Sequence, residues 1–253
     1  MGLETAFEIG QASLQIKRIA DILSASQKDV FVRLPGLMAY WPMGIRFSSG
    51  AVAEHAGPGN SLLQTGICPT GYDGNSFAHL GDGTNYLYAS GGFGVTGLET
   101  FISSSLRGLT IGGWFMIDAY PDTQGGLVTK FGTITEYAYA LYARSTQDIV
   151  FVVSSNGSAL FSVISAVVNL GQWYFFAGRF IPGTEVAVFV DGNKTTNTTA
   201  IPSSIHASAQ NLEIGRYLAL DNRIQHAKAR DVFICAAALS DALIEEIRAT
   251  STP

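Results

Sequence analysis

Apolar and polar residues alternate with a period of two in many short runs, and turn-forming residues separate these runs. The pattern indicates β-strands that bury one face, and turns every ~8–12 residues are typical of a two-sheet sandwich. Residues 149–153 and 160–164 form one expected hairpin, and residues 173–180 and 185–190 form another. We predict about a dozen strands in an all-β fold. The other strands are expected at residues 77–80, 86–88, 109–117, 126–131, 137–143, 212–215 and 229–234.

The N-terminal part of the chain carries a helical pattern. Residues 4–28 contain no proline, and their apolar positions are spaced three and four residues apart. The apolar stripe consists of Ile9, Ile16, Ile19 and Leu23. Such a stripe either covers the sandwich of the same chain or packs against identical copies, and Ile at adjacent a and d positions favours a trimer. We therefore predict a short N-terminal helix in an assembly or anchor segment, residues 1–34.

The sandwich itself is predicted to occupy residues 35–253. Residues 28–35 are expected to be extended and to lead into it, because Pro35-Gly36 is a turn sequence. A second short helix is expected at residues 241–248, where Ser240 stands in the N-cap position.

Composition removes several classes of function. Charged residues make up only 14% of the chain, the net charge is −5, and lysine and arginine do not cluster, so nucleic-acid binding is not expected. No apolar stretch reaches the ~20 residues of a membrane-spanning helix, and the N-terminal residues do not read as a secretory signal peptide. Cys68 and Cys235 are far apart in sequence, which leaves their pairing open, although Cys235 in its apolar run suits a buried thiol.

Four motifs occur in a fixed order along the predicted sandwich. They are Gly36-Leu-Met-Ala-Tyr-Trp-Pro-Met-Gly44, then Leu109-Thr-Ile-Gly-Gly-Trp-Phe115, then Gly171-Gln-Trp-Tyr-Phe-Phe-Ala-Gly178 with Val188-Phe-Val-Asp-Gly-Asn193, and finally Ala238-Leu-Ser-Asp-Ala-Leu-Ile-Glu-Glu-Ile247. In order and spacing they resemble the laminin-G-like, concanavalin A-like β-sandwich, a lectin-type antiparallel two-sheet jelly roll. The resemblance implies that Trp41, Trp114 and Trp173 are framework residues of the core. This fold hosts sugar-binding modules, protein-binding modules and glycosidases, so function depends on the site.

Catalytic chemistry is not expected. The glucanases of this fold carry Glu-x-Asp-x-Glu on one strand, where alternate carboxylates share a face and act as acid and nucleophile. The sequence lacks this spacing, and its four histidines show no zinc-binding pattern. We predict no catalytic residues and no enzymatic activity.

The resemblance suggests one cofactor, a calcium ion. Laminin-G-like domains often hold one Ca²⁺ with an aspartate and loop carbonyls, and Asp118 and Asp231 are the candidate ligands here, with Asp82, Asp122, Asp221 and Asn222 as further oxygen donors. The family's late strand usually begins Ile-Asp, whereas the matching run Ala229-Arg-Asp has Arg230 in place of the first acid. We therefore expect no cofactor, with calcium as the alternative.

Three groups of tyrosines with nearby polar residues suit sugar binding, in which a ring stacks on the pyranose and Asp or Asn takes the hydroxyls. The groups are Asp82, Asn85, Tyr86 and Tyr88; Tyr120, Asp122 and Gln124; and Tyr217, Asp221 and Asn222. The alternative is that these tyrosines are cross-strand packing residues.

Taken with the apolar stripe and the low charge, these features favour a non-catalytic surface protein of a virion, such as a phage decoration or fibre protein, or of another assembly. The lectin-like sandwich would then be displayed outward and could bind glycans. The expected partners are identical copies, with a trimer favoured, and a larger particle. The alternatives are a secreted or cell-surface carbohydrate-binding module and, less favoured, a glycosidase.

Overall fold

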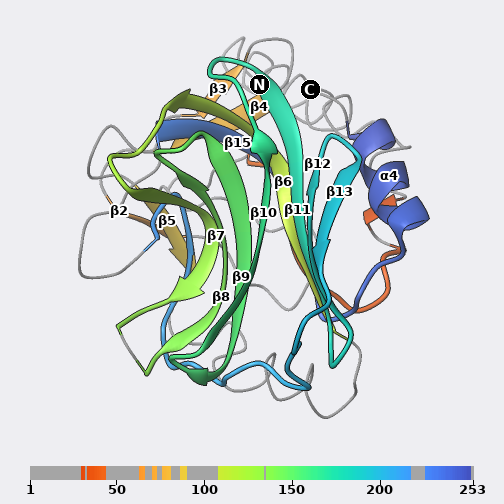
Figure 1. Ribbon diagram of the computed structural model, residues 1–253. Helices are drawn as coiled ribbons and strands as arrows, with labels where there is room; N and C mark the ends of the chain where they lie inside the picture. The colour runs from red at the N-terminus through yellow and green to blue at the C-terminus, as the bar shows by residue number, and fades with distance from the viewer. Residues whose placement is uncertain are drawn as a thin grey trace, which may run out of the picture.

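The structure is a computed structural model that describes residues 30–31, 33–43, 63–65, 70–72, 76–80, 86–89, 108–133, 135–217 and 226–251. In these residues, strands β1 to β15 form two sheets that lie face to face as a jelly-roll sandwich (Figure 1), and every strand pair is antiparallel. The predicted all-β, two-sheet fold is confirmed. The predicted N-terminal helix, with Ile9, Ile16, Ile19 and Leu23, lies outside the described residues.

The eight-stranded sheet has the order β13-β12-β11-β6-β15-β4-β3. Strand β1 completes it by pairing with the second half of β15, while β4 pairs with the first half. The strands are β1 (Leu37–Trp41), β3 (Thr70–Tyr72), β4 (Ser76–Leu80), β6 (Leu109–Ala119), β11 (Trp173–Ile181), β12 (Glu185–Val190), β13 (Asn193–Asn197) and β15 (His226–Cys235).

The seven-stranded sheet has the order β10-β9-β8-β7-β14-β5-β2. Its strands are β2 (Leu63–Thr65), β5 (Tyr86–Ala89), β7 (Gln124–Phe131), β8 (Tyr137–Arg144), β9 (Asp148–Gly157), β10 (Leu160–Val167) and β14 (Leu212–Ile214). The hairpin predicted across residues 154–158 exists, but its strands continue further and Leu160 pairs with Ser154. Strands β4 and β5, which are near neighbours in sequence, belong to different sheets.

The central core lies between the two sheets and follows the alternation of each strand. On β9, Phe151 belongs to the central cluster, whereas its neighbours Val150 and Val152 belong to a separate cluster with tyrosines of the seven-stranded sheet. The sheets meet closely at Gly178 of β11, where a Cβ atom would lie 2.2 Å from the Phe151 ring. Only glycine therefore fits at this position without displacing Phe151.

A second apolar cluster covers the outer face of the eight-stranded sheet. Trp114 lies in this cluster and Trp41 in the central one, while Trp173 is partly buried, in agreement with the framework role that the resemblance implies. Cys235 is a buried free thiol, as predicted, and burial raises the pKa of that thiol. Cys68 lies outside the described residues.

The segment that precedes β1 differs from the prediction of extended chain. Val30 and Phe31 are helical, and the Arg33 and Leu34 amides donate to the Val30 and Phe31 carbonyls at 3.3 and 3.2 Å. The Phe31 ring stacks on Tyr40 with centroids 3.9 Å apart. This contact explains the difference, because a tight turn brings the apolar side chains back onto the sheet.

Helix α4 (Asp241–Thr250) packs outside the eight-stranded sheet, beside β12 and β13 (Figure 1). It begins where predicted, and the Ser240 hydroxyl accepts from the Leu243 amide at 3.2 Å, as an N-cap does. Its buried residues are Ile244 and Ile247.

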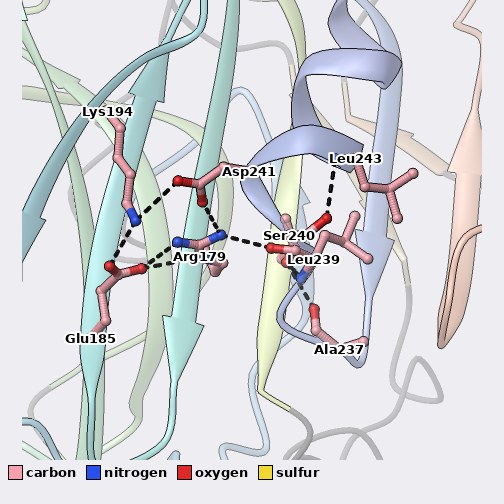
Figure 2. A network of polar contacts seen from close by, with 9 residues as sticks. Arg179, Glu185, Lys194, Ala237, Leu239, Ser240, Asp241 and Leu243 are labelled. Carbon is pink, nitrogen blue, oxygen red and sulfur yellow. Dashed lines mark hydrogen bonds and ion pairs between the residues drawn. The ribbon is translucent and has the colours of Figure 1, made fainter.

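A network of charged side chains attaches the start of α4 to the sheet (Figure 2). Arg179 donates to Glu185 Oε1 at 3.1 and 2.6 Å, to the Leu239 carbonyl at 2.8 Å and to Asp241 Oδ1 at 2.5 Å. Lys194 lies 2.8 Å from Glu185 Oε2 and 3.4 Å from Asp241 Oδ2. Because Arg179 is buried on β11 and its partners come from β12, the chain before α4 and α4 itself, the network fixes the position of the helix.

Candidate ligand-binding face

The tyrosines of two of the three predicted groups lie on the outer face of the seven-stranded sheet. Strand β5 pairs with β14 so that Tyr88 is opposite Glu213 and Leu87 is opposite Ile214. Leu87 and Ile214 belong to the central core, so Tyr86, Tyr88 and Glu213 face outward by alternation. Strand β14 leads directly to Tyr217.

Arg216 connects the two strands of this face. Its guanidinium carbon lies 3.9 Å from the centroid of the Tyr86 ring, and its Nε donates to Glu213 Oε2 at 2.7 Å. A second bond joins Arg216 Nη2 to Glu213 Oε1, which makes the ion pair bidentate. Burial alone would lower the pKa of Arg216, but the hydrogen bonds and charge of Glu213 outweigh it and the pKa is raised.

A row of aromatic rings continues from Arg216 across the sheet. The Tyr217 ring lies 4.4 Å from Tyr142 and 5.4 Å from Phe131, and Phe131 stacks on Tyr137 at 4.4 Å. Tyr217 is only 5% exposed and Tyr142 is 8% exposed, whereas Tyr86, Tyr88 and Tyr137 are partly exposed. Burial raises the pKa of the Tyr142 hydroxyl, although a hydrogen bond with Tyr217 acts against this effect.

Partly exposed tyrosines beside a fixed arginine and carboxylate can contact a polar, ring-shaped ligand. Tyr86 and Tyr88 have ring centroids 6.1 Å apart and an interplanar angle of 48°, so their faces present two different planes. Glu213 and Arg216 were not predicted from the sequence. The sequence Glu-Ile-Gly-Arg does not by itself indicate a binding site. Only the pairing of β14 with β5 places Arg216 over Tyr86.

The remaining predicted ligand residues are placed as follows. Asp82, Asn85, Asp221 and Asn222 lie outside the described residues. Tyr120 and Asp122 lie between β6 and β7, and Gln124 is the first residue of β7; the Tyr120 hydroxyl donates to the Val168 carbonyl, and Asp122 is exposed. The site role of all these residues stays a prediction, and the burial of Tyr217 fits the packing alternative for that ring.

The two candidate calcium ligands are not brought together. Asp118 is exposed beside Ile117, which pairs with Ala227, whereas Asp231 follows Arg230, which pairs with Trp114. Asp118 is four residues along β6 from Trp114, or about 13 Å at ~3.3 Å per residue, and Asp231 lies one residue beyond the partner of Trp114. Asp231 is buried and accepts from the Tyr40 hydroxyl at 2.6 Å and Arg230 Nε at 2.8 Å.

The described part of the chain contains no group of three His, Cys, Asp or Glu residues that could hold a metal ion. This leaves the calcium expectation untested, because Asp82, Asp221 and Asn222 lie outside that part. Within the same described residues, no helix is long and apolar enough to cross a membrane.

Two outer carboxylates of the seven-stranded sheet are engaged by arginine. Glu213 is bound by Arg216, and Asp148 accepts from Arg144 Nε and Nη2 at 2.6 and 2.7 Å. Arg144 holds the pKa of Asp148 below its ordinary value, although burial acts against this effect. Both carboxylates are therefore hydrogen-bonded to an arginine of the same sheet face.

The two curved sheets and the aromatic outer face define a lectin-like β-sandwich. The family model of the concanavalin A-like lectin/glucanases superfamily matches residues 91–245, and the chain belongs to this superfamily. No curated protein matches the chain.

Solved structures with a similar fold include binding domains of botulinum neurotoxins. The binding domain of botulinum neurotoxin DC in complex with SialylT has a TM-score of 0.64 at 11% identity, over 85% of this chain and 52% of that chain. The same domain in complex with rat synaptotagmin II has a TM-score of 0.64 at 11% identity, over 86% and 52%. A structure of botulinum neurotoxin type C, described as dependent on two ganglioside molecules for cell entry, gives 0.64 at 12%, over 86% and 52%. The present chain thus spans about half the length of these chains, and the likeness concerns the fold.

Proposed function

We propose that the chain is a non-catalytic, glycan-binding domain whose ligand contacts the outer face of the seven-stranded sheet. The observation that carries this proposal is the meeting of Tyr86, Tyr88, Glu213 and Arg216 on neighbouring strands. Arg216 covers one face of the Tyr86 ring, so a pyranose would stack on the opposite face or against Tyr88. The guanidinium and carboxylate, already held by each other, offer donors and acceptors to sugar hydroxyls.

Polar residues next in sequence would complete the site. Asp82 and Asn85 precede β5 by a few residues, and Asp221 and Asn222 follow Tyr217 closely. We assign them to sugar hydroxyls on the grounds of residue type and sequence position. The SialylT and ganglioside molecules named for neurotoxin structures of similar fold support this class of ligand.

Display on a larger assembly is the second element of the proposal. The stripe of Ile9, Ile16, Ile19 and Leu23 would join identical copies, with a trimer favoured, and the sandwich would face outward from a virion or another particle. Light scattering of the full chain and of a chain that starts at Lys28 tests this element. If both are monomers, the stripe does not mediate assembly; if only the full chain is trimeric, it does.

The binding proposal is tested on a glycan array, followed by titration calorimetry with the sugars that bind. Tyr86→Ala should weaken binding by about two- to tenfold, from the ~0.5–1.5 kcal/mol of a well-placed aromatic contact. Glu246→Ala, on the exposed side of α4, is the matched control and should bind like the wild type. An array without any bound sugar, or equal affinities for all three proteins, contradicts the proposed face. Release of reducing sugar from a bound glucan contradicts the non-catalytic assignment.

A further inference from the structure

Arg216 carries the positive charge of the sheet-face site, the group formed by Tyr86, Tyr88, Glu213 and Arg216. One edge of its guanidinium binds Glu213, through Nε at 2.7 Å from Oε2 and through Nη2 to Oε1. One face of the guanidinium lies on the Tyr86 ring, 3.9 Å from its centroid. The side chains of Arg216 and Glu213 are only 12% and 5% exposed. The charge of Arg216 is therefore compensated inside the protein before a ligand arrives.

The sheet holds the backbone of both partners of this ion pair. Glu213 lies on β14, between β5 and β7, where it pairs with Tyr88 on one side and with Thr129 on the other. The Arg216 carbonyl accepts from the Thr129 hydroxyl at 2.6 Å. A Cβ atom at Gly126 would lie 2.1 Å from the same carbonyl, so the chain at Arg216 packs directly on β7. Only a side-chain rotation that breaks the ion pair could free Arg216.

Among the described residues of this sheet face, a second arginine is compensated in the same way. Arg144 donates from Nε and Nη2 to Asp148 Oδ1 and Oδ2 at 2.6 and 2.7 Å, and the Thr146 hydroxyl donates to Oδ2 at 2.9 Å. The two arginines and their two carboxylates sum to zero charge, on a chain whose net charge is −5. The described part of this face therefore balances each of its arginine charges with a carboxylate of its own.

A sugar carboxylate could bind Arg216 only by displacing Glu213 or by joining the intact pair. Displacement would leave the buried carboxylate of Glu213 without its partner, which is strongly unfavourable. Joining the pair would place the sugar carboxylate near Glu213 as well as Arg216, so that repulsion offsets attraction while the sugar loses hydration. A neutral sugar avoids both effects, because it can stack on the partly exposed rings of Tyr86 and Tyr88 and leave the ion pair intact.

We propose that the sheet-face site is selective for neutral glycans and rejects glycans whose contacting sugar carries a carboxylate. The inference rests on the proposed function, since it specifies which glycans that site binds. Glu213 sets this selectivity, because it neutralises the group of the site that would attract an anion. The aromatic rings provide the surface for a sugar, and Glu213 determines the charge of the sugar that binds.

The same glycan with and without a charge tests the selectivity. The glycan array is extended so that each neutral glycan, lactose and cellotriose included, stands beside its 6-carboxylate, made by oxidation of the terminal 6-hydroxyl, and beside the methyl ester of that acid. The acid and its ester have nearly the same shape and differ in charge. Each acid should bind at least about tenfold more weakly than its neutral parent, and the ester should regain most of the affinity.

The outcomes of this array separate the inference from the proposed function. If the acids bind as tightly as their neutral parents, the inference is wrong and the proposed function stands. If the array shows no bound glycan of any kind, the proposed function is wrong and the inference falls with it.

Glu213→Gln then tests whether this one residue sets the selectivity. Glutamine keeps the shape of the side chain and removes its charge, so the charge of Arg216 is no longer balanced. The variant should bind the acids about three- to tenfold more tightly than the wild type does, and the gain should shrink in ~500 mM NaCl, which screens charges. Glu246→Gln removes the same charge from the exposed side of α4 and should bind the acids like the wild type.

Equal affinities of the two variants for the acids would overturn the role of Glu213. The comparison of acid and ester on the wild-type protein decides the selectivity even if Glu213→Gln does not fold, since it requires no substitution.

Discussion

Substitution of Glu185 by alanine is the sharpest test of how α4 is held. Glu185 Oε1 receives two bonds from Arg179 at 3.1 and 2.6 Å, and the side chains of Arg179 and Glu185 are only 5% and 12% exposed. Loss of one partner of a buried ion pair costs about 3–5 kcal/mol, because the other charge stays buried. Arg179 would still contact the Leu239 carbonyl and Asp241, so we expect Glu185→Ala to lower the free energy of unfolding by about 2–4 kcal/mol.

The assay is urea unfolding at neutral pH, with the slope m compared between proteins so that a change in midpoint reports stability. Glu245→Ala is the matched control, because Glu245 also pairs with an arginine, Arg248, but at exposures of 48% and 29%. An exposed pair of this kind contributes about 0.2–1 kcal/mol. Equal losses for Glu185→Ala and Glu245→Ala would contradict this expectation, since burial of the Arg179 network would then have no energetic effect.

Three further outcomes are expected. Trp114→Ala should lower the free energy of unfolding by about 3–5 kcal/mol in urea titrations, because the ring is 5% exposed, and a loss below ~1 kcal/mol would show that the outer cluster is not a core. Gly126→Ala should lower the free energy of unfolding by about 1–3 kcal/mol and also weaken glycan binding, because a Cβ would lie 2.1 Å from the Arg216 carbonyl and displace Arg216. Wild-type affinity in calorimetry would contradict the link between the position of Arg216 and glycan binding. The pKa of Asp148 is lowered by Arg144, so its contribution to stability is present above about pH 4 and lost as the pH falls through the lower folded pKa. The difference between wild type and Asp148→Asn in urea midpoint should therefore shrink from pH 7 to pH 2, and a constant difference would disagree with this.

The strands could be predicted where the local pattern alone decides them. The hairpin of β11 and β12 matches its predicted bounds within one residue, because alternating apolar runs flank Pro182-Gly183. Ser240 and the apolar spacing after it likewise predicted α4. The turn at Val30 and Phe31 could not be predicted, because it depends on the stacking of Phe31 on Tyr40 across the sheet surface.

The candidate site could be predicted only in part for the same reason. Tyr86, Tyr88 and Tyr217 were predicted by residue type, but the partnership of Tyr86 with Arg216 requires the pairing of two strands far apart in sequence. The Arg179 network also joins residues 6 and 62 positions apart, so no local pattern contains it. Arginine or glutamate at alternate positions of a predicted strand indicates an outward-facing side chain, but the pattern does not tell which partner that side chain contacts.

The central claim is that a glycan binds on the outer face of the seven-stranded sheet. The most direct measurement is the backbone and side-chain NMR spectrum of the full chain, titrated with the glycan that binds most tightly on the array. We predict that the largest shift changes fall on Tyr86, Tyr88, Glu213 and Arg216, and that the Arg216 Nε–H resonance moves with them. Saturation of binding with these four residues unshifted would contradict it.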